Sequence, residues 1–137
     1  MKPLFQIAEN ENIIVIERTL PESINGFFHR ENDFNLICLE RNLRRVQRKI
    51  TLAHEIGHYF TSSGNVIFQD REFFNTCSLD EHLARKWAAE FLIPEDQLIM
   101  YINHLDGDYL NEYELADIFG VTPEFVRFRV NIRSNIK

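Results

Sequence analysis

The sequence predicts a small α+β domain in which a three-stranded antiparallel sheet precedes several helices. Two observations support this class. Up to residue 40, short β-branched and aromatic segments alternate with polar turns, whereas from residue 42 apolar residues recur at spacings of three and four. The chain has 137 residues, of which 45% are apolar, and this is enough for one domain with a hydrophobic core.

Three segments are expected to form the sheet. Residues 12–18, NIIVIER, are short and β-branched, which favours a strand. The segments INGFFHR (24–30) and FNLICLE (34–40) have the same character and flank the polar turn ENDF. Because the three segments follow one another at short spacing, we expect antiparallel pairing.

Helices are expected in the rest of the chain. The first spans residues 42–60, with Asn42 as its N-cap, and the segment TSSGN ends it. Apolar or small residues at helical spacing form its inward face: Leu43, Val46, Ile50, Ala53 and Gly57. After a long loop, further helices are expected over residues 79–93, 94–103, 111–119 and 123–135, the first of which stops at Pro94.

The stretch TLAHEIGHYF, residues 51–60, carries two histidines and a glutamate on the first helix. His54 and His58 lie one turn apart at the edge of the apolar stripe, where two neutral imidazoles can hold one Zn²⁺ ion. Glu55 lies about a quarter-turn further round, where it can act as the general base for a metal-activated water. Gly57 lets another segment approach closely. The alternative is an amphipathic helix with two boundary histidines and a solvated glutamate.

A catalytic zinc needs a third protein ligand. The second long helix places Glu81 on the same inward face as Ala84 and Ala88, so helical geometry prefers Glu81. An alternative stays open, because SLDE (78–81) also fits a capping box in which Ser78 is the N-cap and Glu81 reaches back to it. The other candidates for the ligand are His29, Asp80, His82, Glu90 and His104.

The segments TLAHEIGHYF and EHLARKWAAEFLIP (81–94) resemble the paired signatures of the ImmA/IrrE family of zinc metallopeptidases. The resemblance implies a zincin-like fold, zinc bound by His54, His58 and Glu81, and Glu55 as general base. Arg85 stands where the family usually has Asn or Asp, which puts the support of the metal site in doubt. Trp87 replaces the usual Phe, which is a change of packing.

The resemblance also implies a function and a division of the chain. Members of the family are cytoplasmic proteases that cleave or inactivate a helix-turn-helix repressor, so the expected partner is a protein substrate of that kind. We expect a zincin-like metallopeptidase domain at residues 1–105 and a helix-turn-helix-like helical pair at residues 106–137. The second helix of that pair is basic, but its phenylalanines and valines favour packing or partner docking over DNA binding.

Composition and charge exclude several classes. The formal net charge of −6 disfavours direct nucleic-acid binding. The longest apolar run, IIVI, is too short to span a membrane, and the N-terminus has no secretory apolar region. Cys38 and Cys77 are far apart and are expected to be reduced thiols of a cytoplasmic protein. Two further functions stay open: a non-cleaving, metal-bound protein that sequesters a regulator, and a DNA-binding regulator.

Overall fold

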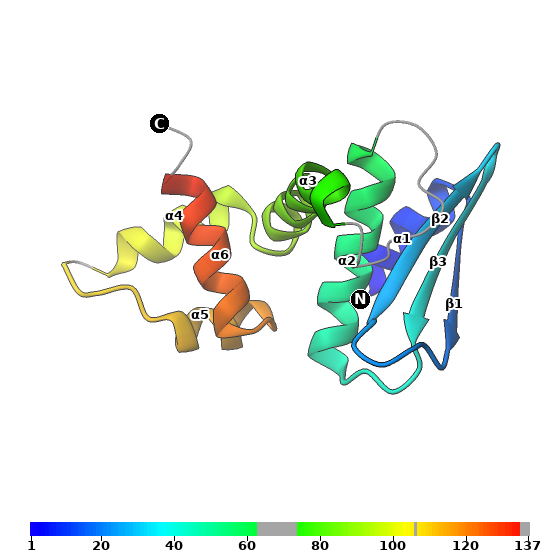
Figure 1. Ribbon diagram of the computed structural model, residues 1–137. Coiled ribbons are helices and arrows are strands. Elements are labelled where there is room, and N and C mark those ends of the chain that lie inside the picture. The colour runs from blue at the N-terminus through cyan, green and yellow to red at the C-terminus, as the bar shows by residue number, and fades with distance from the viewer. Residues whose placement is uncertain (63–73, 106, 135–137) are drawn as a thin grey trace. The chain divides into compact units, whose positions relative to one another are not determined.

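The computed structural model describes residues 1–62, 74–105 and 107–134 (Figure 1). The chain divides into two compact units, Met1–Ala88 and Ala89–Lys137. The first unit contains the sheet and the HExxH segment, and the second unit is helical. The division expected between residues 105 and 106 stays a prediction. The α+β class is confirmed, because one three-stranded sheet accompanies six helices in the described part of the chain.

The elements of the first unit follow the expected order, with one addition at the N-terminus. They are α1 (Lys2–Asn10), β1 (Ile13–Arg18), β2 (Gly26–Glu31), β3 (Phe34–Glu40), α2 (Arg45–Thr61) and α3 (Phe74–Leu92), the last of which continues into the second unit. Sequence reasoning missed α1, which has Pro3 in its first turn, where proline is tolerated in helices. Leu4 and Ala8 are its buried residues.

The expectation of a purely antiparallel sheet is wrong. β2 and β3 form the expected antiparallel hairpin, but β1 pairs with β3 in parallel, so the strand order is β1-β3-β2. The segment between Arg18 and Gly26 spans two strand spacings of about 4.8 Å each, which a chain of this length reaches with ease. The hairpin therefore inserts β3 beside β1 and leaves β2 at the edge of the sheet.

The core of the first unit lies between the sheet and α2 (Figure 1). On the sheet, Phe28, Ile37 and Leu39 are completely buried, and on α2 Leu52 and Ile56 are completely buried as well. The residues Phe28 and Ile37 are register partners, so their side chains leave the sheet on the same face. The middle of the HExxH helix therefore packs on the apolar face of the sheet, whereas its first residues, 45–47, are exposed.

The start of α2 differs from the expected one. The N-cap is Arg44 rather than Asn42, and no side chain accepts a hydrogen bond there. Asn42 instead donates its backbone N–H to Glu40 Oε2 over 2.9 Å, while Glu40 Oε1 accepts from the Leu20 N–H at 2.8 Å. The carboxylate of Glu40 thus holds the turn that leads from β3 into the HExxH helix.

The helices of the second unit agree with expectation within one or two residues. They are α4 (Glu95–His104), α5 (Glu112–Phe119) and α6 (Pro123–Ser134). Asn111 caps α5 by accepting from the backbone N–H groups of Tyr113 and Glu114, and Gly120 ends it in the left-handed conformation at φ 66°. Within residues 1–62, 74–105 and 107–134, none of the helices combines the length and apolar character needed to cross a bilayer.

Candidate metal centre

The HExxH segment lies in the second half of α2, as its periodicity predicts. The imidazole of His58 is fully buried, that of His54 is partly exposed, and Glu55 is buried with an exposed fraction of 5%. Because histidines four residues apart on a helix lie on the same face, both rings point toward one region. Their centroids are 4.9 Å apart and their planes stand at 79° to each other.

The other side of the site comes from α3, which approaches α2 at Gly57. A Cβ atom built on Gly57 would lie 3.0 Å from the Cα of Ala84 and equally near its carbonyl carbon, a separation at which the neighbour must shift. The two helices therefore meet backbone to backbone. Glu81 lies one turn before Ala84 on α3, so this close approach carries its carboxylate to the two histidines.

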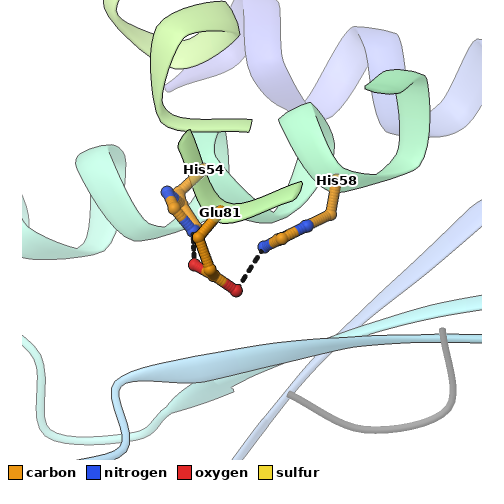
Figure 2. A group of neighbouring side chains, drawn as sticks. All are labelled: His54, His58 and Glu81. Carbon is orange, nitrogen blue, oxygen red and sulfur yellow. Dashed lines mark hydrogen bonds and ion pairs between the residues drawn. The ribbon is translucent and has the colours of Figure 1, made fainter. Parts of the chain in front are cut away.

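The carboxylate of Glu81 stands between the two imidazoles (Figure 2). Its Oε1 is 2.9 Å from His54 Nε2, and its Oε2 is 3.0 Å from His58 Nε2. The ligand atoms of the three residues all lie within 4.8 Å of one another. Figure 2 shows that both ring edges and the carboxylate face a common point.

The pKa values of Glu81 and His58 are both shifted by their surroundings. Burial raises the pKa of Glu81, but its close contacts with His54 and His58 outweigh it, so this pKa lies well below the usual range of a glutamate. Burial lowers the pKa of His58, but Glu81 and Glu55 outweigh it, and the pKa of His58 is raised. Without a metal, the site therefore favours an anionic Glu81 beside a protonated His58.

The side chains fit a divalent metal. Although His58 Nε2 is 3.0 Å from Glu81 Oε2, it makes no hydrogen bond of acceptable direction, and it is buried. A buried ring nitrogen without a well-directed partner is costly, and a metal ion bound at Nε2 in place of a proton would give it one. Two imidazole nitrogens and one carboxylate form a donor set that catalytic zinc sites use, with a fourth position left for water or substrate.

The structure excludes one of the two interpretations of Glu81 that the sequence left open. The helix α3 begins at Phe74, four residues before Ser78, so Ser78 is not an N-cap and the capping-box interpretation is wrong. The helix begins earlier than its apolar pattern suggests, so Glu81 lies in the interior of the helix and not at its first turn. Its carboxylate is then available to the histidines.

The other ligand candidates are not brought to this point. Among the side chains that the structure describes, His54, His58 and Glu81 form the only group of three that could hold a metal ion. His29 lies on β2 with Glu31 Oε1 3.4 Å from its Nε2. His82, Glu90 and His104 are exposed, and so is Arg85, the residue in which the chain departs from the family signature. The side chain of Cys77 lies outside the described residues.

An α+β fold with an HExxH helix and a glutamate from a following helix is an arrangement typical of zinc metallopeptidases. The comparisons agree with this class. Residues 8–131 match the profile of the IrrE N-terminal-like domain, peptidase family M78, and the chain therefore belongs to that family. The family supports a zinc metallopeptidase-type function acting on a protein substrate. Comparison with curated proteins and with solved structures gave no match.

Proposed function

We propose that the protein is a zinc-dependent endopeptidase in which His54, His58 and Glu81 hold the metal and Glu55 is the general base. The observation that carries the proposal is the convergence of two Nε2 atoms and one carboxylate within 4.8 Å. Membership of the M78 family supports the same activity. A merely structural ion pair would not require two histidines four residues apart to share one carboxylate.

The chemistry follows from the positions of the residues. Zinc held at this site would lower the pKa of a water and polarise the scissile carbonyl. Glu55 is the neighbour of His54 in sequence, and its side chain is buried, which supports its proposed role as the proton acceptor. It takes the proton of the attacking water and then delivers it to the leaving amine, a role for which a partly desolvated carboxylate is suited.

The substrate is proposed to bind as an extended segment along β2. The Glu40 N–H donates to Asn25 O over 2.7 Å, and antiparallel pairs alternate between bonded and non-bonded positions. The backbone groups of Phe28 and Arg30 therefore point away from β3. Of the described strands, none pairs with this side of β2. In this proposal a peptide adds there as a further strand. Its affinity then comes mainly from hydrogen bonds between main-chain groups.

The proposed substrate is a helix-turn-helix repressor in the cytoplasm. Its support is the family, together with charge. The protein carries a formal net charge of −6, and the DNA-reading segments of repressors are basic, so the two are electrostatically complementary. Cleavage of the repressor would allow transcription of the genes that it represses.

The charges of α6 disfavour a DNA-binding function for the C-terminal helices. Arg127 pairs with Glu112 at 2.8 Å, and both Arg129 and Arg133 pair with Glu95, at 2.8 and 2.7 Å. Residues 89–137 contain nine acidic and four basic side chains, a formal charge of −5. Arginines that already neutralise carboxylates in an acidic unit are poor ligands for phosphate.

The test compares the wild type with Glu55→Gln and Glu90→Gln, the latter a matched change of an exposed carboxylate on α3. Each zinc-loaded protein is incubated with a lysate of the source cell, and new peptide N-termini are identified by mass spectrometry. We expect discrete cleavage by the wild type and Glu90→Gln, and a loss of about 10²- to 10⁴-fold in Glu55→Gln. Retained zinc in Glu55→Gln would show that the site survives.

Two results would decide against the proposal. If Glu55→Gln cleaves as fast as the wild type, Glu55 is not the base. If the zinc-loaded wild type cleaves nothing but still retains a helix-turn-helix regulator in a pull-down, the protein sequesters its partner without cutting it.

A further inference from the structure

Ser62 contacts the ring of His58 at Nδ1, whereas Glu81 lies at the other ring nitrogen, Nε2. Ser62 is the C-cap of α2, and its backbone N–H donates to the His58 carbonyl oxygen over 2.9 Å. Its hydroxyl oxygen is 3.3 Å from His58 Nδ1, on the side of the ring opposite to Glu81. Ser62 is buried, with an exposed fraction of 7%, and the His58 side chain is completely buried.

This contact bears on which nitrogen of His58 can bind a metal. A neutral imidazole has one nitrogen with a proton and one with a free lone pair. If Nε2 is the ligand atom, the proton must be on Nδ1, and in a buried ring it needs an acceptor inside the protein. The Ser62 hydroxyl oxygen is such an acceptor. It leaves the lone pair of Nε2 directed at the point that His54 and Glu81 also face.

The position of Ser62 is itself fixed from the sheet. Arg30 on β2 donates through one terminal nitrogen to the Tyr59 carbonyl oxygen at 2.7 Å and reaches the Ser62 carbonyl oxygen at 3.5 Å with the other. Its Nε donates to Asn35 Oδ1 at 3.1 Å, and its guanidinium carbon is 5.1 Å from the ring centroids of both Phe28 and Tyr59. The last turn of α2 is thus tied to two strands.

We infer that Ser62 is a positioning residue for the metal centre: its hydroxyl accepts the Nδ1–H of His58 and holds this ring in the tautomer and orientation that present Nε2 to zinc. The inference rests on the proposed function, in which His58 is a zinc ligand. It adds a residue that neither the HExxH motif nor the family signature contains. Mutation of outer partners of this kind typically lowers metal affinity.

The experiment measures the zinc dissociation constant of four proteins by competition with a chelator. These are the wild type, Ser62→Ala, Ser62→Thr and Thr61→Ala. Thr61 is the matched control, because it is the adjacent hydroxyl residue and its hydroxyl donates to the Gly57 carbonyl oxygen at 2.8 Å. We expect Ser62→Ala to bind zinc about 10- to 100-fold more weakly. Ser62→Thr, which keeps the hydroxyl, and Thr61→Ala should bind close to wild type.

A second readout uses only the wild type and keeps the inference testable if Ser62→Ala fails to fold. In the zinc-loaded protein, nitrogen-15 NMR should show a protonated Nδ1 on His58, with slow exchange of that proton and a nuclear Overhauser contact to the Ser62 methylene. A proton on Nε2, or an Nδ1–H that exchanges rapidly with water, would overturn the inference.

The outcomes separate this inference from the proposed function. If Ser62→Ala binds zinc as the wild type does while Glu81→Ala loses it, Ser62 has no positioning role and the zinc site stands. If Thr61→Ala weakens zinc as much as Ser62→Ala, the effect comes from the helix end and the inference is wrong. If the wild type binds no zinc, both fail together.

Discussion

Gly57 of α2 and Ala84 of α3 touch backbone to backbone: a Cβ atom on Gly57 would lie 3.0 Å from the Cα of Ala84 and nearer still to its carbonyl oxygen. Gly57 lies between the two HExxH histidines, and Ala84 lies one turn after Glu81. The contact therefore sets the distance between the histidine pair and the third group of the site. Because Gly57 has no Cβ atom, α3 can approach α2 closely enough to bring Glu81 to the HExxH histidines.

Replacing Gly57 by Ala tests this contact. In an unobstructed helix interior, glycine to alanine stabilises by up to about 1 kcal/mol. Here the methyl group meets backbone atoms that cannot rotate away, so the free energy of unfolding should fall by about 1–3 kcal/mol. Zinc affinity should fall as well, because α3 moves away with Glu81. Urea unfolding and zinc titration measure the two effects, and a more stable variant with unchanged zinc affinity would contradict the contact.

Zinc binding should strengthen as pH rises. The pKa of His58 is raised, because Glu81 and Glu55 outweigh the effect of burial, and a histidine must lose its proton to bind a metal. Below the pKa of His58, zinc displaces one proton from this ring, so affinity should fall about tenfold for each pH unit. Above it, the affinity should level off with respect to His58. Zinc titrations over about three pH units around neutrality, from roughly pH 5.5 to 8.5, would show the slope.

The stability of the metal-free protein should fall as pH rises through the pKa of His58, which is opposite to the trend of zinc affinity. Because the pKa of His58 is raised in the folded state, protonated His58 stabilises the fold. This contribution is complete at a pH below the pKa of His58 in the unfolded state and is lost as pH rises through its pKa in the folded state. Because the pKa of Glu81 is lowered in the folded state, ionised Glu81 also stabilises the fold. This contribution is complete at a pH above the pKa of Glu81 in the unfolded state and is lost as pH falls through its pKa in the folded state. The pair thus stabilises most between about pH 4.3 and 6.5. Melting temperatures with and without zinc should diverge as pH rises above that window; a constant difference would be inconsistent with these shifts.

The two arginines of α6 should differ sharply in their effect on stability. Arg129 is buried and donates to the Ile93 carbonyl oxygen at 2.8 Å, whereas Arg127 is about half exposed and pairs with Glu112. Arg129→Ala should lower the free energy of unfolding by about 1.5–3 kcal/mol, because a buried hydrogen bond to a charged group is lost. Arg127→Ala should have a much smaller effect on the free energy of unfolding, because solvent screens its exposed ion pair. Urea denaturation of both variants decides the matter, and equal losses would refute the structural role of Arg129.

Local patterns in the sequence predicted the parts of the site that one helix supplies. The spacing of His54 and His58 is a property of α2 alone, and the absent side chain of Gly57 already indicated a close neighbour. The C-terminal helices were predictable for the same reason, since Asn111 is a local start signal and Gly120 a local stop signal of α5. The periodicity of residues 42–60 likewise located the helix, although not its first turn.

Features that depend on distant residues could not be predicted in this way. The parallel pairing of β1 with β3 depends on where the hairpin inserts, and strand composition does not encode it. The role of Glu81 depends on where α3 begins, since SLDE suits both a cap and a helix interior. Ser62 gave one usable signal, a hydroxyl four residues after a histidine, but its burial became visible only in the fold.

Zinc content after saturation and dialysis is the measurement to make first, on the wild type, His58→Ala, Glu81→Ala and the control Glu90→Ala. If His54, His58 and Glu81 hold the metal, the wild type and Glu90→Ala should retain about one zinc ion per chain, and the other two variants should lose most of it. Folding of every variant is checked by circular dichroism. A wild type without zinc, or a Glu81→Ala protein that keeps it, would contradict a metal centre built from these three residues.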